Sequence, residues 1–161
     1  MSEDTSPGLA DLLSAGALCT RIVSTVKAGT TLEAAARVMR EDHVGCVVVV
    51  DTLAGESRVA GVLTDRDITV SAVALGLDAR VLRVGDLMSK DVATAREDDP
   101  LAVVLDRMRQ FGVRRIPVVS PEDGLVDLIS FDDLQAALSL QVYAMTEALV
   151  AGRMNEAVKR A

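Results

Sequence analysis

Apolar residues recur along this chain at helical spacing in two places. Capping residues or a proline precede each place, Thr30-Thr31 before the first and Asp98-Asp99-Pro100 before the second. The spacing therefore predicts two helices that begin beside these signals. Their apolar faces comprise Leu32, Ala35, Ala36 and Met39 in the first helix and Leu101, Val104, Leu105 and Met108 in the second.

Short runs of β-branched apolar residues follow each predicted helix. Cys46–Val50 and Ile116–Val119 are too short for helices and are typical of buried strands. A turn and a second strand come next, at Val59–Thr64 in the first half and Leu125–Ser130 in the second. A segment that contains Asp then starts a further helix. With the short strand expected before each first helix, the pattern predicts a β-α-β-β-α unit that occurs twice.

The two units repeat one sequence pattern. Residues 23–25, 32, 39–40, 44 and 49–50 have counterparts about 69 residues later, a fixed period that indicates a repeated structural unit. Gly61–Ile68 corresponds to Asp127–Leu134, with a shorter offset because the first unit has the longer loop at Leu53–Ser57.

The last predicted helix is unusually long and runs from about Asp132 toward Asn155. Two interpretations of its apolar stripe stay open. The stripe packs on its own subunit, as amphipathic helices normally do, or it forms a dimer contact where the helix extends beyond a small body. The stripe consists of Leu134, Leu138, Val142, Met145 and Leu149.

Composition narrows the function classes. A chain of 161 residues fits one compact domain or two small ones that share a core. A net charge of -7 with 2% aromatic residues argues against nucleic-acid binding. No apolar run approaches the ~20 residues that a membrane span requires, and Met1–Gly8 lacks the layout of a signal peptide. Cys19 and Cys46 are isolated thiols. We therefore expect a soluble, cytoplasmic protein.

A tandem unit that ends in Gly-hydrophobic-hydrophobic-Thr-x-x-Asp resembles the cystathionine-β-synthase (CBS) domain pair. The resemblance covers about residues 17–140, and its most specific segments are Gly61–Asp67 and Val113–Val119. It implies an α/β (α+β) fold in which tandem β-α-β-β-α repeats pack about a pseudo-twofold axis, with a long C-terminal helix. We divide the chain into an N-terminal tail and short helix at 1–16, repeats at 17–80 and 81–140, and a helical extension at 141–161.

The resemblance also implies two clefts that can each hold AMP, ADP, ATP or a related adenosyl ligand. An ionised carboxylate at a helix start can accept hydrogen bonds from both hydroxyls of a ribose, and Asp67 and Asp133 occupy such positions. Thr64 and Ser130, three residues earlier, can add a hydroxyl. The alternative is that these four residues only cap helices.

Three arginines are candidates for phosphate contact. The fork of a guanidinium fits phosphate oxygens, which favours Arg114 and Arg115, although both can instead be solvated surface charges. This segment resembles the CBS subunits of AMP-activated kinases, in which basic residues at the matching positions hold nucleotide phosphates. Arg66 is the candidate in the first unit.

Family geometry predicts that each cleft draws on both units. Two departures from the family pattern, Asp127 in place of the usual Gly and the extra charge of Asp132, argue against occupancy of the Asp133 cleft unless Mg²⁺ or an arginine offsets Asp132. Arg114 and Arg115 argue for its occupancy. The predicted clefts combine Cys19, Val23, Ser24 and Val44 with Arg114, Arg115, Ser130 and Asp133 in one case, and Met88, Val92, Ala93 and Val113 with Thr64, Arg66 and Asp67 in the other.

We expect a non-catalytic regulatory module that binds an adenine nucleotide, alone or with Mg²⁺, forms a homodimer and acts on an effector protein. The only histidine, His43, lies at a predicted helix end without the partners that catalysis or metal binding requires. One alternative is a structural or protein-interaction module with vestigial clefts. Another is an enzyme such as a small nucleotide hydrolase, for which the sequence shows no nucleophile or acid-base pair.

Overall fold

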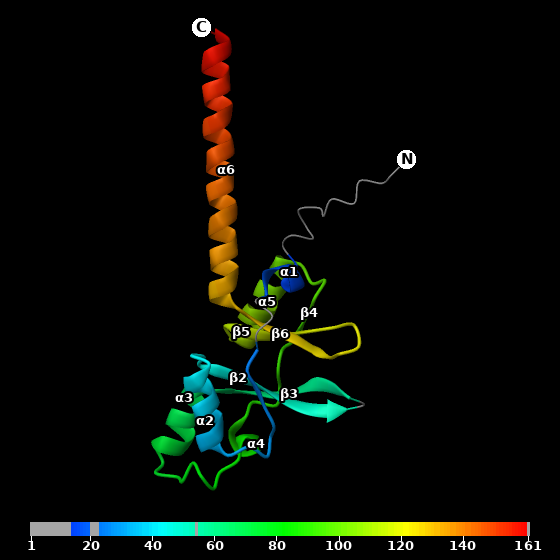
Figure 1. Ribbon diagram of the computed structural model, residues 1–161, viewed down its shortest axis with the longest axis vertical. Coiled ribbons are helices and arrows are strands. Elements are labelled where there is room, and N and C mark those ends of the chain that lie inside the picture. The colour runs from blue at the N-terminus through cyan, green and yellow to red at the C-terminus, as the bar shows by residue number, and fades with distance from the viewer. Residues whose placement is uncertain (1–13, 20–22, 54, 161) are drawn as a thin grey trace.

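The protein folds into two similar halves, each with a three-stranded sheet, and a long helix projects from the second half (Figure 1). The computed structural model describes residues 14–19, 23–53 and 55–160, with side chains up to residue 152. The first half comprises α1 (Ala15–Leu18), β1 (Thr25–Val26), α2 (Leu32–Glu41), β2 (Cys46–Leu53), β3 (Glu56–Thr64), α3 (Asp65–Ile68) and the π-helical turn η2 (Thr69–Val73). The second comprises α4 (Val84–Leu87), β4 (Ala95–Arg96), α5 (Leu101–Phe111), β5 (Arg115–Val119), β6 (Leu125–Ser130) and α6 (Phe131–Arg160).

Both sheets have the same topology, so the predicted repeat and mixed fold class are confirmed. In each sheet a short strand runs parallel to the central strand, which pairs with its antiparallel neighbour in the orders β1-β2-β3 and β4-β5-β6. Each hairpin has its register shift at the equivalent place, between Val49 and Val50 and between Val118 and Val119. A bulge at matching positions in both hairpins is the sign of a repeated design.

One difference between the sheets follows from a proline. In the first half the N–H of Val48 donates to the carbonyl of Ser24 at 3.0 Å. The equivalent of Val48 is Pro117, which has no N–H to donate. Because this hydrogen bond is lost, β4 begins at Ala95, the counterpart of Val26, instead of one residue earlier.

The core is divided into two aliphatic clusters, one for each sheet. The predicted helices are confirmed, because α2 buries Leu32, Ala35 and Met39 and α5 buries the equivalent Leu101, Val104 and Met108. Each helix packs on the central residues of its own hairpin. The strand residues in these clusters are Val47, Val49 and Leu63 in the first and Ile116, Val118 and Ile129 in the second.

The short helices α1 and α4 exchange places between the halves. Ala15 is fully buried in the second cluster, and its N–H donates to the carbonyl of Asp99 at 2.9 Å. Val84 is fully buried in the first cluster, and its N–H donates to the carbonyl of Thr30 at 2.9 Å. The pattern of strands and helices did not include this exchange, which ties each half to the core of the other.

Helices α2 and α5 end in the same left-handed turn. His43 has a φ of 55° and the equivalent Gly112 has a φ of 65°. In both turns the following N–H returns to the helix, from Val44 to the carbonyl of Met39 and from Val113 to that of Met108. His43 therefore lies at a helix end, as predicted.

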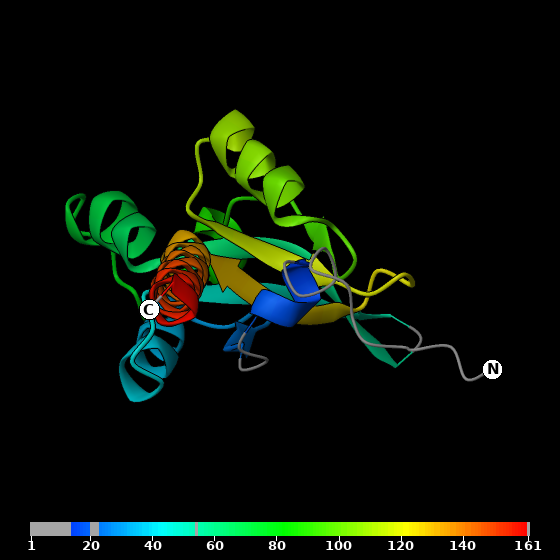
Figure 2. The same cartoon turned by 90° about the horizontal axis from the view of Figure 1, so that it is seen from above.

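Helix α6 packs on the body only at its base. Leu134 is fully buried, whereas Leu138 is 40% exposed and Val142, Met145 and Leu149 are 63–66% exposed. The helix continues well past the second sheet and is seen nearly end-on in Figure 2. Within the described ranges, no helix combines the length and the hydropathy that crossing a bilayer requires.

We expect Gly61→Ala to lower the free energy of unfolding by about 1–3 kcal/mol, as overpacking of a dense site does. A Cβ at this position would lie 2.7 Å from Met88 Sδ and 2.9 Å from the carbonyl oxygen of Ser89. Urea denaturation followed by circular dichroism measures the loss. Gly29→Ala is the control, because a Cβ there meets nothing within 4 Å; equal stabilities for the two variants would contradict the expected clash.

Candidate functional site

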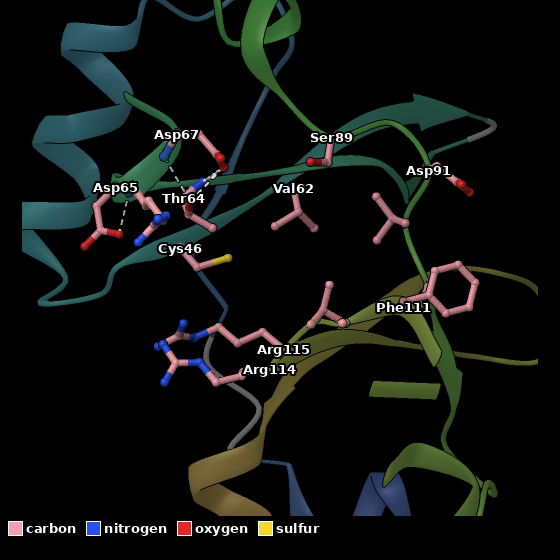
Figure 3. Close-up of a pocket in the computed structure, with 15 residues that line it drawn as sticks. Cys46, Val62, Thr64, Asp65, Asp67, Ser89, Asp91, Phe111, Arg114 and Arg115 are labelled. Carbon is pink, nitrogen blue, oxygen red and sulfur yellow. Dashed lines mark hydrogen bonds between the residues drawn. The ribbon is translucent and has the colours of Figure 1, made fainter. Parts of the chain in front are cut away.

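A cavity of about 490 Å³ lies between the two halves (Figure 3). Its size falls in the range of small-molecule sites. Three segments border it: the end of the β2–β3 hairpin with the start of α3, the chain that leads from α4 to β4, and the turn between α5 and β5. The lining residues are Cys46, Val62, Thr64, Asp65, Arg66, Asp67, Ser89, Asp91, Val92, Ala93 and Phe111–Arg115.

Thr64 and Asp67 form a capping box at the start of α3. The N–H and the hydroxyl of Thr64 donate to Asp67 Oδ2 at 2.9 and 2.7 Å, and the N–H of Asp67 donates to Thr64 Oγ1 at 3.2 Å. These bonds confirm that both residues cap the helix. They use only one carboxylate oxygen, and Oδ1 accepts no hydrogen bond from the described part of the chain. The carboxylate therefore keeps an acceptor for a ligand.

Three arginines converge on the same cavity without partners. The guanidinium groups of Arg66, Arg114 and Arg115 make no hydrogen bond or ion pair with any residue in the described ranges, whereas those of Arg107 and Arg109 pair with carboxylates. In Figure 3, Arg114 and Arg115 lie across the cavity from Thr64 and extend toward the end that holds the α3 residues. Guanidinium groups with unused donors are suited to an anion with several oxygens.

The other end of the cavity combines an aromatic ring with a carboxylate. Phe111 and Asp91 lie at the end away from the arginines in Figure 3. Ser89 is fixed beside Val62 by a reciprocal pair of backbone hydrogen bonds of 2.9 and 3.1 Å. The guanidinium groups and the aromatic ring therefore lie at different ends, and a flat group can pack against the ring.

Cys46 lines the cavity from the start of β2, but its thiol is not activated. Its side chain is buried, and burial raises the pKa of the thiol to about 11, although the charge of Arg115 acts in the opposite direction. The thiol therefore stays protonated near neutral pH and is a poor nucleophile.

The structure corrects the predicted division of residues between the clefts. Arg114 and Arg115, predicted to lie with Asp133, line the Asp67 cavity, because the turn before β5 faces the start of α3. Met88 does not line the cavity; it packs on the first core cluster, with its sulfur facing Gly61. The predicted residues that the cavity brings together are Thr64, Arg66, Asp67, Val92, Ala93, Val113, Arg114 and Arg115.

Several residues that line the cavity were not among the predicted site residues. Cys46 is the counterpart of Arg115 at a strand start, and Phe111 and Gly112 directly precede the predicted Val113, so the repeat alignment could have indicated them. Asp65 and Ser89 carry no such signal. Ser89 is found only because its chain crosses β3 in three dimensions.

The residues predicted for the Asp133 cleft have other recorded contacts. Ser130 and Asp133 form a second capping box, with hydrogen bonds of 2.9, 2.5 and 3.2 Å. Ser24 donates to Asp42 at 2.6 Å, and the thiol of Cys19 donates to the carbonyl of Gly16 at 3.3 Å. Val23 is half-buried and Val44 is exposed. Residues 20–22, which connect Cys19 to Val23, lie outside the described residues.

Comparisons with known proteins agree with the repeat. A family model, CBS domain, matches residues 15–72 and 84–140. The uncharacterized 17.7 kDa protein in the bps2 3′ region of Acidianus ambivalens is 34% identical over 80% of this chain and 74% of that protein. Hypoxic response protein 1 of Mycobacterium tuberculosis is 32% identical over 77% of this chain and 80% of that protein. The homoserine O-acetyltransferase of Methanohalobium evestigatum is 28% identical over 70% of this chain, but the match covers only 21% of the enzyme.

Solved structures share the fold. The CBS domain protein PAE2072 of Pyrobaculum aerophilum, complexed with AMP, superposes with a TM-score of 0.68 and 25% identity over 74% of this chain and 88% of that chain. The cytosolic domain of the Mg²⁺ channel MgtE in complex with ATP superposes with a TM-score of 0.65 and 28% identity, over 78% of this chain and 48% of that chain. The hexameric CBS-CP12 protein of bloom-forming cyanobacteria superposes with a TM-score of 0.68 and 25% identity, over 76% of this chain and 66% of that chain. The chain described here belongs to the CBS domain family and carries two copies of a domain that serves as a regulatory module.

Proposed function

We propose that this protein is a non-catalytic regulatory module that binds an adenine nucleotide in the Asp67 cavity. One observation carries the proposal. The Asp67 carboxylate, which has an unused oxygen, shares a cavity with Arg114 and Arg115, whose guanidinium groups have no partner in the described part of the chain. An adenine nucleotide has hydroxyls that a carboxylate accepts and phosphates that guanidinium groups bind.

In the proposed complex, the ribose, the phosphates and the base occupy different parts of the cavity. The ribose lies at Asp67 and Thr64, its hydroxyls donating to the free carboxylate oxygen. The phosphates lie toward Arg114 and Arg115. The base packs at the end of the cavity near the ring of Phe111.

The comparisons support a nucleotide ligand and regulation more than catalysis. One structural neighbour contains AMP and another contains ATP. The match to the acetyltransferase is confined to about a fifth of that enzyme, so it points to an attached module and not to a shared active site. The cavity lining includes no histidine, and its one thiol has a raised pKa. By analogy with other regulatory modules of this family, the output is control of an effector protein. The isolated thiols suit a cytoplasmic setting.

Asp67→Asn tests the proposal. The amide can still cap α3, but it replaces charge-assisted hydrogen bonds to the ribose with neutral ones. We expect AMP to bind the wild-type protein in isothermal titration calorimetry and the variant to bind roughly 10-fold or more weakly.

Asp86→Asn is the matched control, because Asp86 caps α4 outside the cavity by accepting a hydrogen bond from the N–H of Arg83 at 2.8 Å. Its affinity should equal that of the wild type. If the folded wild-type protein takes up no AMP, ADP or ATP and its melting curve does not shift, the interaction module with vestigial clefts becomes the better account.

We also propose that α6 joins two copies of this chain. Between Leu138 and Gly152 the only charged residue is Glu147, while Leu140, Tyr143 and Val150 are 52–70% exposed in addition to the stripe. A helix that is apolar around most of its surface is normally covered. A second α6 fits this surface because it is equally apolar and brings few charges that would need partners.

Light scattering after size-exclusion chromatography tests the association. We expect the wild-type protein to have at least twice the mass of the 17.0 kDa chain. The double variant Val142→Glu, Leu149→Glu should be monomeric, because it places charges in the apolar contact. Ala144→Glu, Ala151→Glu is the control, because these two exposed residues lie on the face of the same helix opposite the stripe, and it should stay associated. A monomeric wild-type protein would exclude the contact.

A further inference from the structure

The two repeats place very different charges at equivalent positions around their capping boxes. We propose that only the Asp67 cavity takes a phosphate-bearing nucleotide, so that each chain binds one such ligand and not two. This inference rests on the proposed function and specifies the ligand class and the stoichiometry of that site.

The sheet registers define the equivalent positions. Arg115 pairs with Ser130 just as Cys46 pairs with Thr64. The carbonyl of Arg114 accepts from the N–H of Phe131 at 2.8 Å, and that of Gly45 accepts from the N–H of Asp65 at 3.1 Å. Gly45 and Cys46 are therefore the counterparts of Arg114 and Arg115.

The third arginine has an acidic counterpart. Arg66 directly precedes the capping Asp67, and Asp132 directly precedes the capping Asp133. Phe111 at the end of α5 corresponds to Asp42 at the end of α2.

The substitutions reverse the local charge. Three arginines line the cavity of the first capping carboxylate, whereas the positions equivalent to them hold a glycine, a buried neutral thiol and a carboxylate. Asp42, the counterpart of Phe111, adds a further carboxylate, which accepts a hydrogen bond from the hydroxyl of Ser24. A phosphate there would meet like charges, and ionised groups of the same sign repel one another.

The Asp67 cavity also draws its cations from both repeats, Arg66 from the first and Arg114 with Arg115 from the second. A phosphate bound to these groups would join the two halves by charge as well as by packing. We therefore expect affinity to increase with phosphate number, and adenosine to bind more weakly than AMP or ADP.

Equilibrium dialysis with labelled ADP at saturating concentration measures the number of sites. We expect one ADP per chain. The double variant Arg114→Gln, Arg115→Gln should weaken ADP binding roughly 10-fold or more and affect adenosine much less, because the lost contacts are charge-assisted. Arg40→Gln is the matched control, because the guanidinium of Arg40 also has no partner in the described part of the chain but lies outside the cavity lining.

Asp133→Asn separates the clefts, because it alters the equivalent capping box and should leave both the stoichiometry and the affinity for ADP unchanged. Two ADP per chain, a loss of sites in Asp133→Asn, or unchanged binding in the arginine variant would each overturn the one-cleft assignment while adenine-nucleotide binding itself stood. No uptake of ADP or adenosine by the folded wild-type protein would overturn the proposed function and this inference with it.

Discussion

The exchange of α1 and α4 between the halves is the interaction on which the arrangement of this protein depends. Ala15 and Val84 are fully buried in the core of the opposite repeat, and each is fixed by a backbone hydrogen bond of 2.9 Å. Neither repeat can therefore complete its core without the other. The exchange also directs the chain after α4 across β3, which places Ser89 beside Val62 and forms one wall of the cavity. A cavity between repeats is thus a consequence of how the cores are closed.

Helix capping and ligand binding are compatible at the same aspartate. The capping box orients Asp67 by satisfying Oδ2 from the backbone and side chain of Thr64, which restricts the rotamers that the carboxylate can adopt. A carboxylate that is already held in place loses little further conformational freedom when it binds a ligand through Oδ1. The two interpretations drawn from the sequence, a helix cap and a ligand contact, are therefore compatible, and the arginines that line the Asp67 cavity have neutral or acidic residues at the equivalent positions.

The repeat, the helices and the strands could be predicted from sequence because they depend on local periodicity and on similarity at a fixed spacing. The capping residues were predictable for the same reason, since Thr64 and Asp67 lie three residues apart. The partners of Arg114 could not be predicted, because which cleft the α5–β5 turn faces depends on the packing of one repeat against the other. Met88 was misassigned for a related reason: position along the chain does not reveal that its side chain faces Gly61 and the core.

The two repeats share a backbone topology but differ in charge at equivalent positions, so the two sides of the module are chemically different. Gly45 and Cys46 give the first repeat a neutral strand start, whereas the guanidinium groups of Arg114 and Arg115 keep donors that an anion can accept. A ligand held at Arg66, Arg114 and Arg115 would stabilise contacts between the halves on one side only. Because α6 continues directly from the second repeat, any shift of that repeat relative to the first changes where the exposed helix points. Regulation requires only that the ligand bind two such arrangements with different affinity. A ligand in the proposed Asp67 cavity, which lies between the two halves, would provide a physical route for that coupling.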